Sequence, residues 1–346
     1  MHERSVNKIL ALVPNWLGDV AMCTPALRAL RRRFPDADLA VAGRPSACAL
    51  LEGLPWFSAI IPFEARLGFV DTIKVSYRLR IHADDVAVVF PHSFRAALLA
   101  GLAGATRRVG YDRDGRGLLL TDRVPPHQED GRIQPVYMAH EYLELVRRLG
   151  CEDDGLGLEL RADADEVERV LGHFAGTGPK VGLAPGAAFG PSKRWPAERY
   201  AQVADALTAR LGAQCVLLTG PGEDAIRDAV EANATSGLTR CDEGRPSIEN
   251  FKAVVSQLDL LIGNDSGPRH VAVAFHVPTV CIMGPTSPRY SEGPYERGHV
   301  LRVDVDCGPC QKSVCETDHR CMTRITVEEV ARAAEAVLEE GRGGAP

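Results

Sequence analysis

The chain has 346 residues, of which 45% are hydrophobic and 25% charged, and its formal net charge is −6. This length exceeds the usual size of one domain and predicts two. The composition is that of a globular protein, and the negative charge argues against a general nucleic-acid binder. No run reaches the ~20 apolar residues that span a bilayer, and residues 1–16 lack the apolar core of a signal peptide. We therefore expect a cytoplasmic protein.

Short apolar runs alternate with helical segments in both halves of the chain. Strands are predicted at 8–13, 38–42, 58–61, 85–90, 108–111 and 118–120, and then at 180–184, 214–219, 260–262, 279–283 and 300–303. Helices are predicted between them, for example at 93–102, 138–149 and 164–174. This alternation predicts an α/β protein with parallel sheets.

The segment 176–179, Gly-Thr-Gly-Pro, is interpreted as the linker between two doubly wound, Rossmann-like domains, 1–175 and 180–325. Ligands bind at the carboxyl ends of the strands in such domains, and we expect these edges to face a central cleft. A final helix is predicted at 326–340, with Thr326 as N-cap and Glu329 as its capping-box partner.

The first predicted strand leads into Asn15-Trp16-Leu17-Gly18-Asp19. A carboxylate at a strand-to-helix turn can cap the helix. It can also act as a general base, with a pKa tuned by apolar neighbours. Both interpretations of Asp19 remain open from the residues alone.

Basic residues are concentrated in the first half of the chain. Residues 66–123 hold ten Lys or Arg against six Asp or Glu. In a chain that is acidic overall, this excess favours an anionic partner for the first domain. For any single arginine, a solvated helix face is the better interpretation.

The loop after the strand at 180–184 reads PGAAFGPSKRWP and carries Lys193 just before a helix. A lysine in this position can act as a point charge on a leaving phosphate. The next strand-to-helix turn carries Glu223 and Asp224, which can bind ribose hydroxyls or cap the helix. Neither a Walker A motif nor a GxGxxG fingerprint is present, which disfavours an NAD enzyme.

The turn GNDSGPRH at 263–270 is the most informative segment of the second half. Gly263 and Gly267 allow a ligand to approach the backbone, and Asp265 or Ser266 can cap the following helix. The N-terminus of a helix is a ready anion site, and His270 adds a hydrogen-bond donor beside it. Together with the Lys193 loop, this turn predicts a diphosphate site. An ordinary strand–turn–helix joint is the alternative.

Four of the ten cysteines, Cys307, Cys310, Cys315 and Cys321, are clustered with the spacing C-x2-C-x4-C-x5-C, and His319 lies among them. The spacing resembles a zinc knuckle but lacks a second C-x-x-C pair. Free thiols that hold the C-terminal loop are the favoured interpretation, with a structural zinc as the alternative. The other six cysteines are expected in the core.

With these motifs in view, the chain resembles the lipopolysaccharide heptosyltransferases, glycosyltransferase family 9, and is most similar to their heptosyltransferase II branch. The resemblance covers nearly the whole length. It depends on six ordered segments: NWLGDVAMCTPALRAL at 15–30, SFRAALLAGLAGATRRVGY at 93–111, GRGLLLTDRVP at 115–125, the loop at 185–203, the segment at 263–288 and the cysteine cluster at 307–322.

The resemblance implies a GT-B fold in which the segment 326–346 crosses back to the N-terminal domain. It also implies inverting transfer of L-glycero-D-manno-heptose from ADP-heptose to the inner core of lipopolysaccharide, heptosyl-Kdo2-lipid A. An acceptor on lipid A implies peripheral contact with the cytoplasmic face of the inner membrane. A nucleotide-sugar epimerase and a non-catalytic nucleotide-sugar binding protein remain the alternatives.

Site residues follow from the resemblance position by position. Asp19 matches the proposed general base and Lys193 the lysine that binds the donor phosphate, so both are expected to be catalytic. Asp265, Ser266, Gly267 and His270 match the donor-diphosphate turn, and Glu223 matches the ribose position.

The basic first half fits an acceptor that carries Kdo carboxylates and lipid A phosphates, with Arg95, Arg107 and Arg108 as the predicted contacts. His92 stands where asparagine is expected. No DxD-like pair of carboxylates is present, which favours catalysis without a metal cofactor.

Overall fold

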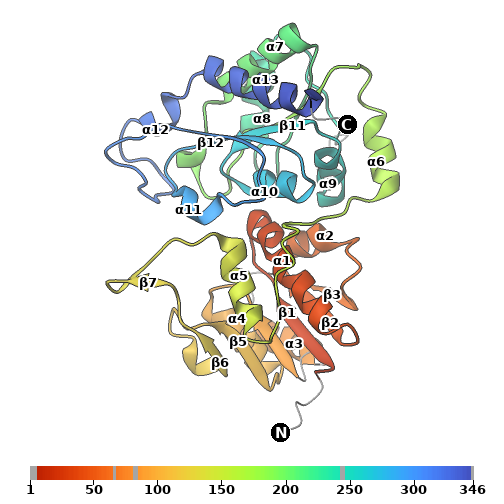
Figure 1. Ribbon diagram of the computed structural model, residues 1–346, viewed down its shortest axis with the longest axis vertical. Helices are drawn as coiled ribbons and strands as arrows, with labels where there is room; N and C mark the ends of the chain where they lie inside the picture. The colour runs from red at the N-terminus through yellow and green to blue at the C-terminus, as the bar shows by residue number, and fades with distance from the viewer. Residues whose placement is uncertain (1–5, 65–67, 81–84, 242–245, 344–346) are drawn as a thin grey trace. The chain divides into compact units, whose positions relative to one another are not determined.

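The computed structural model describes residues 6–64, 68–80, 85–241 and 246–343. The chain forms two compact units, Met1–Arg161 and Ala162–Pro346 (Figure 1). Each unit contains a parallel sheet covered by helices, which confirms the predicted α/β class.

The sheet of the first unit has the order β3-β2-β1-β4-β5-β6, and all its neighbouring strands are parallel. The winding reverses between β1 and β4, so the carboxyl ends of these two strands mark the expected ligand crevice. A short antiparallel pair, β7 and β8, follows the sheet. The strands are β1 (Lys8–Leu12), β2 (Asp38–Gly43), β3 (Ala59–Pro62), β4 (Val86–Val89), β5 (Arg107–Tyr111), β6 (Asp122–Val124), β7 (Gln128–Glu129) and β8 (Arg132–Ile133).

Helices bury both faces of this sheet. Leu10 and Leu12 of β1 belong to a core cluster that also contains side chains of α3 and α4. Ile9 and Ala11, which point to the opposite face, are equally buried. This explains why the strands read as continuous apolar runs. The helices are α1 (Leu17–Arg33), α2 (Pro45–Leu51), α3 (Phe69–Leu79), α4 (Phe94–Leu102) and α5 (Met138–Arg147).

The sheet of the second unit has the order β10-β9-β11-β12-β13, and its winding reverses between β9 and β11. Its strands are β9 (Lys180–Ala184), β10 (Gln214–Leu217), β11 (Leu260–Asn264), β12 (Thr279–Met283) and β13 (Gly298–Arg302). Its helices are α6 (Ala164–Leu171), α7 (Ala197–Leu211), α8 (Asp224–Asn233), α9 (Ile248–Ser256), α10 (Gly267–Ala274), α11 (Pro288–Ser291), α12 (Arg320–Thr323) and α13 (Val327–Gly343).

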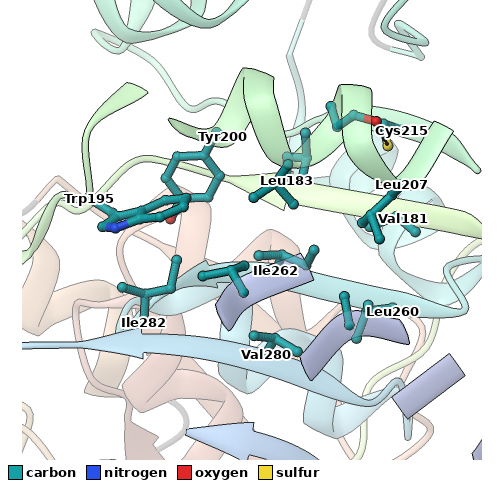
Figure 2. Close-up of a cluster of buried hydrophobic side chains, with 14 of the residues drawn as sticks. Val181, Leu183, Trp195, Tyr200, Leu207, Cys215, Leu260, Ile262, Val280 and Ile282 are labelled. Carbon is teal, nitrogen blue, oxygen red and sulfur yellow. Dashed lines mark hydrogen bonds between the residues drawn. The ribbon is translucent and has the colours of Figure 1, made fainter. Parts of the chain in front are cut away.

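One face of this second sheet packs against α7 and α13. Val181, Leu183, Leu260 and Ile262 point into this core (Figure 2). Trp195 and Tyr200 close one end of the cluster, with their rings edge to face at 5.2 Å, and they fix the start of α7 on the sheet.

The boundary between the units differs from the predicted linker at 176–179. Gln214 accepts a hydrogen bond from the backbone N–H of Gly176 at 2.7 Å and donates to the carbonyl of Gly178 at 3.1 Å. A Cβ atom on Gly178 would lie 1.9 Å from the carbonyl oxygen of Gly212, so only glycine fits there. This segment is therefore part of the second unit. In the first unit, Arg28 pairs with Asp154 at 2.6 Å and holds the segment that precedes the boundary.

The C-terminal helix also differs from its expected place. The predicted capping box is confirmed, because Thr326 and Glu329 exchange hydrogen bonds. However, α13 buries Val330 and Ala334 in the core of the second unit. Arg210 of α7 pairs with Glu328 of α13 at 2.9 Å. The residues of α13 thus belong to the second unit and not to the first.

The prediction of a strand at 118–120 was wrong. Residues Gly117–Leu119 form a 3-10 turn, and β6 begins three residues later, at Asp122. A Cβ atom on Gly117 would lie 2.1 Å from a carboxylate oxygen of Asp112, so the Asp112 side chain packs directly on this turn. The apolar run at 118–120 therefore belongs to a turn, although Leu120 is buried in the core.

Candidate functional site

Asp19 lies beyond the carboxyl end of β1, in the first turn of α1. The N-cap residue of α1 is Trp16, so Asp19 lies inside the helix and is not its N-cap. Its Oδ1 atom accepts a hydrogen bond from the hydroxyl of Tyr142 on α5 at 3.0 Å. A tyrosine therefore fixes the orientation of this partly exposed carboxylate.

Two buried groups beside Asp19 remain protonated. Burial raises the pKa of the Tyr142 hydroxyl well above its usual value, and the charge of Asp19 raises it further. Burial, followed by the same charge, also raises the pKa of the Cys23 thiol. Tyr142 therefore acts as a donor to Asp19. Tyr142 could not be predicted as a site residue, because its only signal in the sequence is the helical spacing of buried residues in α5.

Asn264, the last residue of β11, organises the switch point of the second unit. Its Oδ1 atom accepts hydrogen bonds from the N–H of Trp195 at 3.1 Å and from the hydroxyl of Tyr200 at 3.0 Å. Its Nδ2 atom donates to the carbonyl of Pro185 at 2.7 Å. One buried amide thus ties both ends of the 185–195 loop to the end of β11. This role of Asn264 was not predicted from the sequence.

Lys193 and Asp265 meet at this edge, as the sequence predicted for two parts of one site. The Nζ atom of Lys193 lies 2.7 Å from Oδ2 and 2.8 Å from the carbonyl oxygen of Asp265. The Phe189 ring lies 5.2 Å from the same Nζ atom. An ammonium group has three N–H donors, so one remains for a ligand. The Lys193 side chain is 14% exposed, which leaves it accessible.

Asp265 also begins a chain of buried charges. It accepts hydrogen bonds from Arg269 at 3.0 Å and from the hydroxyl of Thr286 at 2.7 Å. Arg269 in turn makes a bidentate pair with Glu296, with both distances 2.6 Å. Burial alone would raise the pKa of Asp265, but Lys193 and Arg269 outweigh it and hold this pKa well below the usual range. Asp265 is only 4% exposed, and its carboxylate holds Lys193 in place. Its direct contact with the donor stays a prediction.

The N-terminus of α10 adjoins this lysine. Ser266 is the N-cap residue, yet its side chain caps nothing, and among the described residues its buried Oγ atom has no hydrogen-bond partner. Pro268 has no N–H group, and the N–H of Arg269 donates to the carbonyl of Ser266 at 3.2 Å. Among the described residues, the N–H of Gly267 is therefore the donor that stays open at this end of the helix. Burial, and then the charge of Arg269, lower the pKa of His270 to about 4, so its ring is neutral at pH 7. Lys193, Ser266 and the helix end together can bind an anion.

Glu223 lies against the loop that carries Lys193. It is the N-cap residue of α8, and its Oε2 atom accepts a hydrogen bond from the N–H of Gly220 at 2.8 Å. A Cβ atom on Gly186 would lie 2.1 Å from one carboxylate oxygen of Glu223 and 2.2 Å from the other. The structure therefore brings the predicted ribose-binding carboxylate to the loop that carries Lys193.

The three predicted acceptor residues do not lie together. Arg95 is exposed in the first turn of α4, beyond the carboxyl end of β4. Arg107 and Arg108 begin β5 and so lie at the amino edge of the sheet, opposite the edge at which such folds bind ligands. Arg107 pairs with Asp122 at 2.7 Å, and Arg108 donates to two backbone carbonyls. The prediction for Arg107 and Arg108 is therefore corrected: Arg107 joins β5 to β6, and Arg108 binds the segments that precede and follow β5.

The segment that carries the clustered cysteines contacts the Lys193 loop. Cys307, Cys310, Cys315 and Cys321 line one small cavity together with His319. In the described ranges, no group of three His, Cys, Asp or Glu side chains is placed to hold a metal ion. The Nε2 atom of His319 lies 2.6 Å from the carbonyl oxygen of Ser192, and the Ser192 hydroxyl donates to the carbonyl of Lys312 at 2.6 Å. These contacts fix the residue that precedes Lys193.

Known proteins resemble the chain over nearly its whole length. The family model described as Glycosyltransferase family 9 (heptosyltransferase) matches residues 72–320. Lipopolysaccharide heptosyltransferase 2 of Escherichia coli K12 is 29% identical over 343 residues, which are 96% of this chain and 98% of that protein.

Two solved structures share the fold. The structure of E. coli ADP-heptose LPS heptosyltransferase II has a TM-score of 0.79 and 26% identity, and covers 97% of this chain and 99% of its own. A family 9 glycosyl transferase from Veillonella parvula has a TM-score of 0.84 at 23% identity, with 96% and 98% covered. These likenesses confirm the predicted GT-B class of fold. Because the family model matches most of the sequence, the chain belongs to glycosyltransferase family 9, the heptosyltransferases, and is a glycosyltransferase.

Proposed function

We propose that this protein transfers L-glycero-D-manno-heptose from ADP-heptose to the inner core of lipopolysaccharide, heptosyl-Kdo2-lipid A, with inversion of the anomeric carbon. The anion site formed by Lys193, Ser266 and the N-terminus of α10 carries the proposal, because it fits a diphosphate. The names of the relatives supply the sugar and the acceptor class.

Lys193 and α10 are suited to a leaving diphosphate. Negative charge grows on the diphosphate as the bond to the sugar breaks, and fixed donors stabilise this charge without reorganising. Asp265 already holds Lys193 in place at 2.7 Å. His270 is neutral, so it contributes a hydrogen bond and not a charge. Glu223, which lies beside Gly186, is assigned to accept hydrogen bonds from the ribose.

Asp19 is assigned as the general base. Its carboxylate takes the proton of the acceptor hydroxyl while that oxygen bonds to the anomeric carbon, on the face opposite the diphosphate. The bond between the anomeric carbon and the diphosphate oxygen breaks, and ADP leaves with the electron pair. A single displacement of this kind inverts the anomeric configuration. The hydrogen bond from Tyr142 at 3.0 Å keeps the carboxylate oriented for this step.

The acceptor is anchored in a membrane, and the protein is assigned to its surface. Within the described parts of the chain, no helix has the length and apolar character needed to cross a bilayer. We place the protein in the cytoplasm, in peripheral contact with the cytoplasmic face of the inner membrane. The basic excess at 66–123 supports attraction to an anionic acceptor.

A comparison of two lysine variants tests the donor site. Lys193→Met should raise the Kd for ADP and the donor KM at least tenfold, because the site loses its charged donor. Lys180→Met is the matched control, since Lys180 lies 5.7 Å from the Phe174 ring but at the amino end of β9. The control should stay within twofold of wild type. Equal effects in the two variants would contradict the assignment.

Product analysis separates heptosyl transfer from the alternative functions. Purified protein, ADP-heptose and isolated inner-core acceptor should give an acceptor heavier by one heptose, together with ADP, in mass spectra. An epimerase would convert the donor when no acceptor is added. A non-catalytic binding protein would bind ADP and form no product, and Asp19→Asn would then change nothing that can be measured.

A further inference from the structure

Unpartnered polar atoms mark the ligand-binding edges of both sheets. The residues that carry these atoms lie at the carboxyl end of a parallel strand or in the segment that follows it. A buried polar group without a partner destabilises the folded protein, so a ligand or water is expected at such positions. Among the described residues there are seven such side-chain atoms: Arg44 Nε, His92 Nε2, Arg113 Nε, Arg116 Nη2, Arg194 Nε, Ser266 Oγ and Arg302 Nε.

Three of these atoms belong to one cluster in the first unit. His92 follows β4, and Arg113 and Arg116 follow β5, the neighbouring strand in the sheet. The Nδ1 atom of His92 lies 3.2 Å from Nη1 of Arg113. Two guanidinium groups and an imidazole therefore gather at the carboxyl edge.

Arg116 forms the buried back of the cluster. It has no exposed surface, and it donates to the carbonyls of Tyr111 and Pro91, which leaves Nη2 open. Burial, and then the neighbouring charge of Arg113, lower the pKa of Arg116 to about 10. Arg116 therefore stays charged at neutral pH. Because this charge is buried, binding of a nearby negative charge is favoured.

Two carboxylates lie beside the cluster but leave its unpartnered nitrogen atoms without a hydrogen bond. Glu141 lies 3.2 Å from Nε2 of His92, and Asp114 lies 3.3 Å from Nε of Arg113, but neither contact is a hydrogen bond. Each of the side chains of His92 and Arg113 is 24% exposed. An anion from solution can therefore reach Arg113, with the charge of Arg116 behind it.

The cluster shares its edge with Asp19. Asp19 follows β1 and His92 follows β4, which is the next strand in the sheet. Tyr142, the donor to Asp19, directly follows Glu141, which faces His92. An acceptor whose hydroxyl reaches Asp19 would therefore bring its neighbouring groups over the cationic cluster.

We propose that His92, Arg113 and Arg116 form an oxyanion subsite that takes a carboxylate or phosphate group of the acceptor. A guanidinium presents a planar pair of donors that matches such groups. The subsite rests on the proposed function, because that function supplies an anionic acceptor and makes Asp19 the base.

Kinetics of Arg113→Gln in the full chain test the subsite. The acceptor KM should rise at least tenfold, while kcat and the donor KM stay within threefold. Added salt should raise the wild-type acceptor KM more than that of the variant, because salt screens the lost attraction. Arg113→Lys should recover part of the loss. Arg32→Gln, which removes an exposed charge from the last turn of α1, is the control and should stay within twofold.

Two acceptor fragments distinguish the source of the oxyanion. One carries sugar carboxylates without phosphate, and the other carries phosphate without a sugar acid. The fragment that binds the subsite should show the tenfold effect of Arg113→Gln, and the other fragment should not. If Arg113→Gln resembles Arg32→Gln with both fragments, or if Arg107→Gln shows the effect in its place, the subsite is wrong.

Calorimetry of fragment binding without donor separates this proposal from the proposed function. A wild-type protein that binds a fragment but transfers no heptose would disprove the function. The subsite would still be supported if Arg113→Gln weakened that binding at least tenfold. It would be disproved if wild type and variant bound both fragments equally or if neither protein bound either fragment.

Discussion

Asp265 is a buried carboxylate that holds the lysine of the proposed donor site in place. It lies between Lys193 and Arg269, at 2.7 and 3.0 Å, and Arg269 is neutralised in turn by Glu296. Breaking such a buried pair by removing one partner typically costs about 3–5 kcal/mol. The position of Lys193 is thus fixed before a donor binds, which reduces the ordering cost of binding.

Asp19 is the residue on which turnover should depend most. Asp19→Asn keeps the size of the side chain and an oxygen that can accept from Tyr142, but it removes the proton acceptor. General-base catalysis contributes ~10²–10⁴-fold, so kcat should fall by about that factor. Steady-state kinetics and ADP titration measure the two effects, and the affinity for ADP should stay near the wild-type value. A kcat within about threefold of wild type would reject the assignment.

His270 should make stability depend on pH. Its pKa is about 4 in the folded protein and 6.5 unperturbed, so the folded state binds fewer protons between these values. Its contribution to stability is complete above pH 6.5 and is lost as the pH falls toward 4, by up to about 3 kcal/mol. In thermal melts across this window, His270→Asn should show a shallower loss than wild type. Exposed His299 is the control, and an unchanged slope in His270→Asn would contradict the prediction.

Much of the site could be predicted from position along the chain. Asp19, Lys193 and Ser266 all follow predicted strands, and the carboxyl ends of parallel strands share one edge. Asn264 and Arg269 could not be predicted, because their roles depend on partners distant in sequence. The excess of basic residues predicted Arg107 and Arg108 as acceptor contacts. However, both residues begin β5, so they lie at the edge of the sheet opposite the expected ligand site.

At the scale of elements, the segment that carries Cys307, Cys310, Cys315 and Cys321 supports the loop that carries Lys193. Ser192 and His319 join the two segments, and a Cβ atom on Gly190 would lie 2.3 Å from the carbonyl oxygen of Ser313. The two loops therefore pack backbone to backbone, next to Lys193. The thiols line the cavity under this contact.

Cys310→Ser should therefore lower thermal stability more than it lowers turnover per folded molecule. Cys310 is partly buried, whereas Cys307 is exposed, so Cys307→Ser should have a smaller effect. Melting temperature and turnover, corrected for the folded fraction, measure both. Elemental analysis of the purified protein tests the alternative. About one zinc per chain, with equal losses in the two variants, would establish a metal knuckle.

Element boundaries were predicted less well than element types. Residues 118–120 are apolar like a strand, but the tight turn at Gly117 places them in a 3-10 turn. The segment 176–179 has the composition of a linker, yet Gln214 binds it to the second unit. In both cases contacts with residues elsewhere in the chain decided the structure, and local composition does not record them.

At the scale of the whole molecule, the chain forms two separately cored units, and the proposed function gives each of them a different task. The first unit carries Asp19 and the arginine cluster, and the second carries Lys193, Glu223 and the α10 anion site. Each set lies at the carboxyl edge of a doubly wound sheet. The proposed function assigns acceptor chemistry to the first unit and donor binding to the second, and this assignment can be tested by separating the units.

The fragment 162–346 should fold and bind ADP without added Mg²⁺. It retains the complete second sheet and the buried side chains of α13, and Lys193 and α10 provide the positive charge for the diphosphate. The shorter fragment 177–325 should fail to fold, because it lacks α13 and with it the buried Val330 and Ala334. Circular dichroism and calorimetry with ADP, with and without EDTA, measure these outcomes. Loss of binding by folded 162–346, or binding that requires Mg²⁺, would show that the donor site needs more than this unit supplies.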